Sequence, residues 1–383
     1  MKLTQQHLKL AKQIIRKRKL CNNCLGRQFA QVSTGLTNRK RGELIRKALG
    51  ELEPKSCPLC KNLFKGLEKW AKKAEAELKI HFKTFLVGTK LSPELAESEQ
   101  SLWKETGVKW CEPLKSELNR ELGKLLEPKL KKPVDKETPD VVVILNLNSE
   151  RIELSITPLF FFGGYKKLIR GIPQTKWKMY PESVEDIIAR PFMAATKGKG
   201  HALHGVGRED IDARCLDWRP FVLEIKKPKS RSVSLPEMRK IINKSGKVNV
   251  KDLRPSNKKE VIKLKALRPD KSYRALVAFE KPVKGLERLK NLKGLIKQRT
   301  PARVLHRRAD LLRKRLVKSI KWKKTGQKEA VLEVKGEAGL YIKELVSGDM
   351  GRTKPSAAKL LDNPAKVKEL DVIKIWSRYG KSK

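Results

Sequence analysis

The residues best suited to chemistry lie in the segment Gly205–Arg214, which reads G-V-G-R-E-D-I-D-A-R. Its glycines favour tight backbone turns, and residues 219–225, which follow, contain β-branched and aromatic side chains that favour a strand. We therefore expect Asp210 and Asp212 on a loop that leads into a sheet, with arginines beside them. A carboxylate near positive charge stays ionised and is suited to act as a nucleophile or a base. The pattern is equally consistent with a surface loop stabilised by ion pairs.

Two C-x-x-C pairs have the spacing of tetrahedral zinc ligands. The expected ligands of one Zn²⁺ are Cys21, Cys24, Cys57 and Cys60. The zinc would be structural, because all four ligand places are filled by the protein. Two disulfides or four buried free cysteines are the alternatives, and disulfides are disfavoured in a cytosolic chain. His201 and His204 have no further ligands at a suitable spacing, so we interpret them as local polar residues.

The charge of the chain indicates a polyanionic partner. It contains 89 Lys and Arg residues against 42 Asp and Glu residues, which gives a formal net charge of +47. Nucleic acid is the expected partner, because phosphate neutralisation dominates such affinities; a membrane surface is the weaker alternative. No apolar run reaches the roughly 18 residues that a transmembrane helix needs, and residues 1–18 lack the apolar core of a signal peptide. We therefore expect a soluble cytoplasmic protein that does not bind membranes.

The segment Gly163–Trp177 is basic, interrupted by glycines and aromatic near both ends. These properties suit a loop that grips an RNA backbone, with Tyr165 and Trp177 available to stack on bases. A linker between domains is the alternative, although it would not account for the dense lysines and arginines.

Hydrophobic periodicity predicts a mixture of helices and strands, which is typical of the α+β class. Helices are expected over residues 4–20, 61–79, 94–106, 113–126, 182–189 and 236–242. Strands are expected over residues 82–91, 140–146, 151–162, 219–225, 247–253, 261–267, 272–279 and 370–375, with a basic, strand-like stretch at 300–316.

The motif G-R-E-D-I-D-A-R, followed by R-P-F, resembles the active-site motif of the archaeal and eukaryotic tRNA pseudouridine synthases of the Pus-ten type. The resemblance continues in C-L-G-R-Q-F-A after the first cysteine pair and in T-P-A-R-V-L-H-R-R-A-D from Thr300. It also includes Y-I-K-E from Tyr341 and the G-D-M-G-R-T-K-P that follows. The matches run in order from Cys21 to Ile375.

This resemblance implies a set of site residues. Asp210 would be the catalytic carboxylate, because it follows G-R-x as the catalytic aspartate does in the family. Lys343 would pair with Asp210, Tyr273 would stack on the target base, and Ile342 and Leu370 would form apolar walls. The full substrate-binding set, with the two aromatic residues named above, is Tyr273, Ile342, Lys343, Leu370, Arg208, Tyr165 and Trp177. The resemblance implies no organic cofactor and no catalytic metal.

The implied fold is α+β, with a zinc-bearing, THUMP-like N-terminal module followed by a mostly antiparallel pseudouridine-synthase sheet with flanking helices. The expected domains are a zinc-bearing helical segment at 1–80, a THUMP-like RNA-binding module at 81–165 and a catalytic domain at 166–383. The implied substrate is tRNA at T-loop uridines 54 and 55 in standard tRNA numbering. A monomer without an obligate protein partner would bind the T-arm. The chain departs from the family pattern at Gly164 and at Asp217–Trp218.

Two other functions compete with this one. A methyltransferase or thiouridine synthase with a THUMP domain would need a glycine-rich cofactor loop after a strand, which the sequence lacks. A non-catalytic, basic, zinc-containing RNA-binding protein, such as a ribosome assembly factor, would share the charge and the cysteines. It would have no use for a set made of Asp210, Tyr273 and Lys343.

Overall fold

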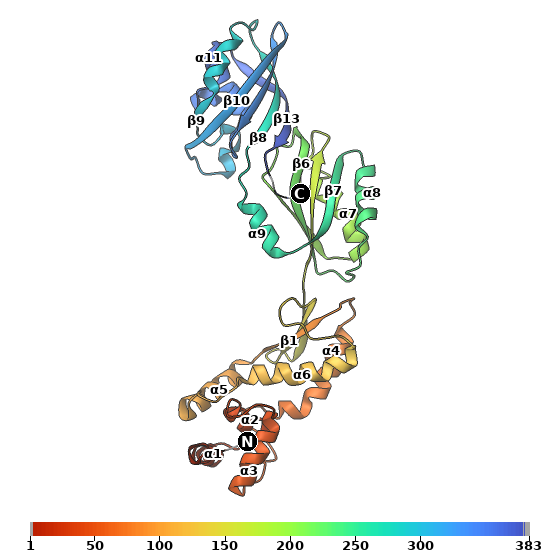
Figure 1. The fold of residues 1–383 in the computed structure, drawn as a ribbon, viewed down its shortest axis with the longest axis vertical. Coiled ribbons are helices and arrows are strands. Elements are labelled where there is room, and N and C mark those ends of the chain that lie inside the picture. The colour runs from red at the N-terminus through yellow and green to blue at the C-terminus, as the bar shows by residue number, and fades with distance from the viewer. Residues whose placement is uncertain (1–2, 378, 380–383) are drawn as a thin grey trace. The chain divides into compact units, whose positions relative to one another are not determined.

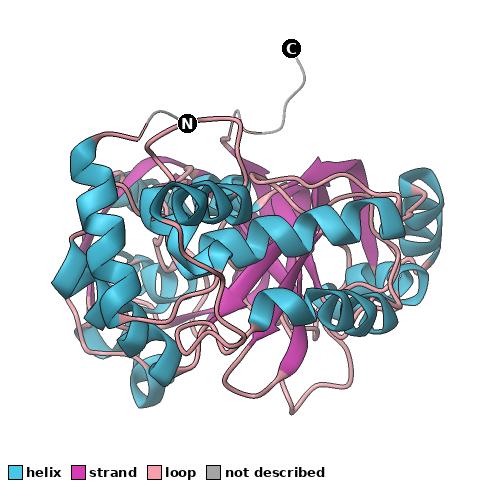
Figure 2. Ribbon diagram, turned by 90° about the horizontal axis from the view of Figure 1, so that it is seen from below, coloured by secondary structure: helices cyan, strands magenta, loops and turns pink. Residues whose placement is uncertain are grey.

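The computed structural model describes residues 3–377 and residue 379. The chain divides into an N-terminal unit, Met1–Thr157, and a C-terminal unit, Pro158–Lys383. Each unit contains both helices and strands (Figure 1), which Figure 2 colours cyan and magenta. Because the strand pairs are also mostly antiparallel, the predicted α+β class is confirmed. No helix in the described part of the chain combines the length and apolarity needed to cross a membrane.

The N-terminal unit begins with helices and ends with a small sheet. Its helices are α1 (Gln5–Lys17), α2 (Asn22–Gly26), η1 (Arg27–Phe29), α3 (Asn38–Leu49), η2 (Leu63–Gly66), α4 (Leu67–Glu77), α5 (Pro93–Thr106) and α6 (Leu114–Leu130). Its sheet has the order β1 (Phe85–Lys90), β2 (Val141–Asn146), β3 (Arg151–Ile156), and β1 pairs with β2 in parallel. Alternate residues of β2, namely Val141, Val143 and Leu145, are buried in one core. The same core includes the four cysteines of the two C-x-x-C motifs.

The C-terminal unit is built on one ten-stranded sheet with the order β12-β9-β10-β11-β8-β13-β6-β4-β7, and β5 pairs with β6. The strands are β4 (Leu159–Lys167), β5 (Gly200–Gly205), β6 (Ala213–Lys226), β7 (Val248–Ser256), β8 (Lys271–Phe279), β9 (Gly294–Gln298), β10 (Arg313–Gly326), β11 (Glu329–Gly336), β12 (Thr353–Lys354) and β13 (Ala365–Ile375). Within this sheet β13 and β6 pair in parallel, and this pairing brings Leu370 beside Ala213.

Helices cover both faces of the sheet. Around β4 and β6, α7 (Val184–Thr196) and α8 (Leu235–Lys244) pack on the face that carries Phe161 and Phe221. Helix α9 (Lys258–Ala266) lies on the other side of the sheet from α7 and α8 (Figure 1). Its Val261 and Leu264 cluster there with Phe162 and Val222. The other helical segments are η3 (Leu286–Leu292), η4 (Ala302–Arg307), α10 (Ile342–Ser347), η5 (Asp349–Gly351) and α11 (Ala357–Leu361).

The strand expected over residues 151–162 is in fact two, because β3 ends at Ile156 and β4 begins at Leu159 in the other sheet. Two further predicted strands are wrong. Residues 261–267 lie mostly in α9, because the Asn257 side chain caps the helix by accepting from the Glu260 amide, and Val261 and Leu264 bury one helical face. Residues 300–316 form 3₁₀ helix η4 and only the start of β10. The Thr300 hydroxyl holds this segment in a loop, since it donates to the Ala309 carbonyl and accepts from the Leu311 amide.

Candidate active site and metal site

The loop between β5 and β6 carries the motif G-R-E-D, and a buried lysine of β4 holds its backbone. Lys167, at the end of β4, is fully buried and donates through Nζ to the carbonyl oxygens of Asp210 and Ile211 at 3.1 and 2.9 Å. The Asp210 carbonyl also accepts from the Ala213 amide at 3.1 Å, and Ile211 accepts from the Gly171 amide at 3.0 Å. Burial lowers the pKa of Lys167, against the pull of nearby carboxylates. These contacts fix the backbone of the loop at Asp210.

Glu209 points into the core below this loop. Its carboxylate lies 3.1 Å from Nε of Arg219, and neither side chain is exposed to solvent. The Tyr165 hydroxyl lies 3.1 and 3.0 Å from the two oxygens of Glu209 and accepts from Gln174 Nε2 at 2.7 Å. The expectation that Tyr165 is available to stack on a base is therefore wrong. Its position in β4 turns its ring toward the core, where it packs against Phe221.

Two cations meet the carboxylates of the loop. Arg303 Nη2 lies 3.2 Å from Asp210 Oδ2, and Lys343 Nζ lies 3.5 Å from the same oxygen. Lys343 makes its shorter contacts to Asp212, at 2.7 Å from both carboxylate oxygens. Arg303 also binds Glu344 through Nε at 2.7 Å, and Glu344 is buried. Arg303 is thus held on one side by a buried carboxylate while it contacts Asp210 on the other.

The two aspartates differ in exposure. The Asp210 side chain is 36% exposed and the Asp212 side chain 64% exposed. Partial burial alone would raise the pKa of Asp212, but the hydrogen bonds and charge of Lys343 outweigh it and hold that pKa below its usual range. Asp212 is therefore a fully engaged ion-pair partner of Lys343, while Asp210 is the more enclosed carboxylate and has longer contacts to its cations.

An aromatic residue and two aliphatic residues lie in the core next to this loop. Ile342 and Leu370 are buried in one cluster with Ala213, the first residue after the loop, and Tyr273 packs against that cluster. Burial raises the pKa of the Tyr273 hydroxyl to about 12, and the charge of Asp210 acts in the same direction. The structure thus brings Tyr273, Ile342 and Leu370 together near Asp210.

Arg170 ties this region to β13. Its Nη1 donates to the carbonyl oxygens of Asp212 and Leu370 at 3.1 and 2.6 Å, and its Nη2 lies 2.8 Å from an oxygen of Asp371. Sequence reasoning assigned no specific role to Arg170 or to Arg303. Both lie in the basic motifs that resembled the family, but no spacing rule indicates which arginine of a motif reaches a carboxylate far away in the sequence.

The remaining two predicted site residues lie at the protein surface. Arg208 is exposed and makes no hydrogen bond or ion pair within residues 3–377 and 379. Trp177 is partly exposed, and the Arg307 guanidinium of η4 lies 5.5 Å from its ring centroid. The structure therefore leaves both side chains accessible to a ligand.

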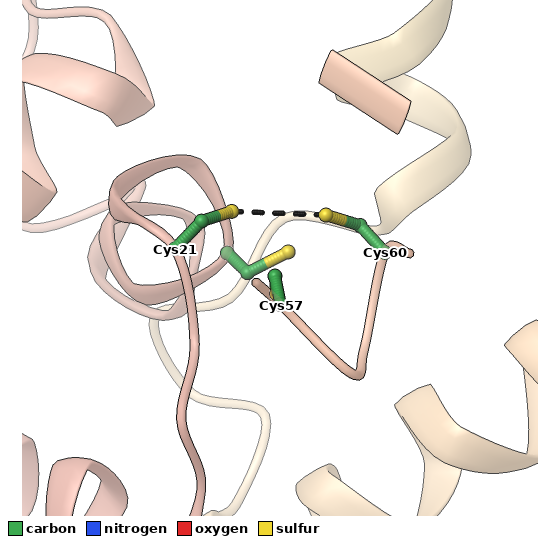
Figure 3. Close-up of side chains that lie close together, drawn as sticks. Cys21, Cys57 and Cys60 are labelled. Carbon is green, nitrogen blue, oxygen red and sulfur yellow. Dashed lines mark hydrogen bonds between the residues drawn. The ribbon is translucent and has the colours of Figure 1, made fainter. Parts of the chain in front are cut away.

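The four predicted zinc ligands converge in the N-terminal unit. Their sulfur atoms all lie within 4.8 Å of one another, and all four residues are buried. Cys21 and Cys60 are 3.7 Å apart at sulfur, and Figure 3 shows their side chains with that of Cys57 around one point. None of the cysteines in the described residues forms a disulfide. Four thiol sulfurs at this spacing fit one tetrahedral metal ion.

The two histidines behave as local polar residues. His201 Nδ1 lies 2.9 Å from Glu185, and His204 Nε2 lies 3.0 Å from Glu224. Each histidine thus has its own carboxylate partner, which is consistent with their interpretation as local polar residues.

Comparison with known proteins finds relatives along most of the chain. The family model described as Pus10, C-terminal, matches residues 160–376, and the model described as Pus10 THUMP domain, archaeal, matches residues 70–146. The protein named tRNA pseudouridine synthase Pus10 from Methanothrix thermoacetophila is 40% identical over 95% of this chain and 93% of its own length. The protein of the same name from Pyrococcus furiosus is 41% identical over 96% of this chain and 97% of its own length. The chain belongs to the Pus10 family.

Pus10 membership confirms the resemblance inferred from the motifs, and it confirms that the chain is an enzyme of the isomerase class. The THUMP prediction is also confirmed, although the matched residues begin before the predicted start at residue 81. A solved structure titled "Crystal Structure of a Cbf5-Nop10-Gar1 Complex" is 17% identical, with a TM-score of 0.33, and covers 56% of this chain and 50% of that chain.

Proposed function

We propose that this Pus10 enzyme converts uridine to pseudouridine in the T-loop of tRNA, at positions 54 and 55, with Asp210 as the catalytic carboxylate. The observation that supports it most directly is the setting of Asp210. A buried anchor fixes its backbone, and two cations lie 3.2 and 3.5 Å from one of its oxygens. An aromatic ring and apolar walls lie beside the loop. The names of the curated relatives supply tRNA as the substrate.

The reaction breaks the bond between N1 of uracil and the ribose, turns the base and rejoins it through carbon, so the target nucleotide must first leave its stack. Asp210 would attack the nucleoside or take up the proton that the new carbon bond releases. Lys343 and Arg303 would keep this carboxylate ionised and in place. Tyr273 would hold the base, and Ile342 and Leu370 would exclude water. This chemistry requires no organic cofactor.

Asp210 is a better candidate for the carboxylate than Asp212. Both oxygens of Asp212 are occupied by Lys343 at 2.7 Å, and its side chain is the more exposed of the two. Asp210 contacts Arg303 and Lys343 through Oδ2, and its Oδ1 accepts no hydrogen bond in the described residues, so this oxygen is open to a substrate. Asp212 would act as a positioning residue that holds Lys343.

For the N-terminal unit we propose one structural Zn²⁺ on the four cysteines and a role in gripping the T-arm. The donor set fits the metal, because four thiolates satisfy the tetrahedral preference of zinc and leave no open position for catalysis. We further propose that the enzyme acts as a monomer in the cytoplasm.

The test compares Asp210→Asn with its neighbour Asp212→Asn as the matched control. Asp210→Asn should lower the single-turnover rate of pseudouridine formation by at least about 10³-fold, the range seen when catalytic groups are removed. It should leave tRNA affinity nearly unchanged, because affinity comes from many phosphate contacts. Asp212→Asn should cost much less. If Asp210→Asn retains a rate near that of the wild type, the assignment is wrong. A wild-type chain that binds tRNA but forms no pseudouridine would favour the RNA-binding alternative.

A further inference from the structure

A hollow of about 420 Å³ lies in the C-terminal unit, outside the site described above. Its lining comes from β4, β6, β7, β13 and the residues that follow β13, and includes Phe162, Trp218, Lys251 and Lys374. Phe162 packs on the sheet face that carries α9. Trp218 lies four residues before Val222, which packs on the same face, so Trp218 also points to that face. A cavity of this size is within the range of small-molecule sites, roughly 300–1,000 Å³.

Trp218 lines this hollow from β6. Its ring faces one cation from β4, which pairs with β6, and one from β7, which lies beyond β4 in the sheet. Lys166 Nζ of β4 and Lys251 Nζ of β7 lie 4.7 and 5.1 Å from its ring centroid. Gly164 leaves room against the ring, since a Cβ added at this glycine would touch the Trp218 side chain at 3.5 Å. An indole that is partly exposed and flanked by ammonium groups offers stacking surface and positive charge at one place.

The lysines around Trp218 have weak carboxylate contacts or none within the described residues. Lys166 makes no ion pair in the described residues. Lys251 has one exposed contact, to Asp252 at 3.2 Å, and such contacts contribute little. Lys374 Nζ lies 3.9 Å from Asp217, whose Oδ2 already accepts from the Ile375 amide at 2.7 Å. The lining carries two lysines, Lys251 and Lys374, and two aspartates, Asp217 and Asp252. Lys166, over the Trp218 ring, adds one further positive charge beside the hollow.

We propose that this hollow, the Trp218 pocket, binds one unpaired nucleotide of the substrate RNA. The base stacks on Trp218, and its phosphates lie among Lys166, Lys251 and Lys374. Aromatic platforms beside tracks of positive charge are how proteins hold single-stranded RNA. This inference rests on the proposed function only in taking tRNA as the RNA. It adds a second point of contact, separate from the loop that carries Asp210.

The test uses the full-length chain and a matched pair of tryptophan variants. Trp376 is the control, because it is 51% exposed, lies in the same unit and has Lys335 Nζ at 3.8 Å from its ring, but does not line the hollow. Trp218→Ala should weaken tRNA binding about 5- to 100-fold, as expected for loss of one base stack. Trp376→Ala should change it less than about 2-fold, and Trp218→Phe should retain most of the affinity. The single-turnover rate at saturating tRNA should be unchanged in all three variants.

Two further measurements separate stacking from charge and from folding. Lys251→Glu should weaken tRNA binding and lower the salt slope by about one for each phosphate that the protein no longer neutralises. Ultraviolet crosslinking of the wild-type chain to tRNA, followed by mass spectrometry, should place a nucleotide on the peptide that contains Trp218. The crosslink does not depend on a variant, so it decides the question even if Trp218→Ala fails to fold.

Several outcomes would overturn the proposal. Unchanged tRNA affinity in a folded Trp218→Ala variant would do so, as would crosslinks found only elsewhere. So would protection of Trp218 by an acidic peptide but not by tRNA. These results would leave the Asp210 assignment intact. Conversely, if the wild-type chain forms no pseudouridine while Trp218→Ala still loses tRNA affinity, the proposed function fails and the RNA site stands.

Discussion

We predict that the buried charge of Lys271, next to the candidate active-site loop, lowers the stability of this Pus10 enzyme. The residue begins β8 and is only 7% exposed. A Cβ added at Gly207, within the loop, would lie 3.4 Å from both Lys271 Nζ and Arg219 Nη1. Lys271 has no carboxylate partner within 4 Å in the described residues, and its hydrogen bond to the Pro269 carbonyl is long, at 3.4 Å. Burial, together with the charge of Arg219, lowers the pKa of Lys271 to about 8.

The magnitude and the sign follow from this pKa. A fall from 10.5 to about 8 means that burying the charged lysine costs about 3 kcal/mol at pH 7. Between pH 8 and 10.5 the unfolded chain binds more protons than the folded chain, so the cost declines as pH rises, to about 1 kcal/mol at pH 10. Lys271→Met should therefore raise the free energy of unfolding of the C-terminal unit by about 3 kcal/mol at pH 7 and by much less at pH 10.

The assay is urea unfolding of the full-length chain read by pulse proteolysis, with fragments identified by mass so that the C-terminal unit is scored separately. Lys297→Met is the control, because Lys297 is an exposed strand lysine of the same unit and should show neither the gain nor its pH dependence. A Lys271→Met variant that is less stable than the wild type at pH 7, or whose gain does not shrink by pH 10, would refute the reasoning.

Two further predictions concern the N-terminal unit. Metal analysis should find one zinc per chain. Cys60→Ser should release the zinc and destabilise the N-terminal unit but not the C-terminal unit, because structural zinc contributes folding free energy directly. A metal-free chain with a fully folded N-terminal unit would contradict this. A chain that begins at Pro158 should bind tRNA more weakly and with a smaller salt slope, yet recover much of the single-turnover rate at saturating tRNA. Unchanged affinity would show that the N-terminal unit is not an anchor, and no activity at saturation would show that it shapes the active site.

The parts of the structure that the sequence predicted well are those determined by spacing. Each C-x-x-C pair directs its two thiols toward one point. The spacing of the four cysteines was therefore enough to predict that Cys21 and Cys24 meet the second pair. The loop position of Asp210 before a strand followed from glycines on one side and β-branched residues on the other. Both predictions depend on short stretches of chain, in which local conformation is strongly restricted.

Predictions failed where long-range packing decides the outcome. The sequence placed Tyr165 in a basic segment but did not show which face of the sheet its side chain occupies. That face depends on packing against distant parts of the chain, and its buried partner, Glu209, lies 44 residues away. Residues 261–267 are rich in residues that fit either element, and only the Asn257 cap and the burial of one helical face distinguish the two.

The contact between Arg303 and Asp210 could not be predicted from the sequence motifs alone. Asp210 lies before β6, Arg303 lies in η4 between β9 and β10, and Lys343 lies in α10 after β11. In the sheet order, β8 and β13 lie between β6, which follows Asp210, and the strands β9 to β11, which flank Arg303 and precede Lys343. The three side chains therefore meet only when these strands are paired. The family resemblance indicated Lys343 as the partner of Asp210, whereas the geometry divides the role: Arg303 is closer to Asp210, and Lys343 is held by Asp212. Two cations from separate helical segments therefore contact Asp210, and in the proposed mechanism both would keep this carboxylate ionised and in place.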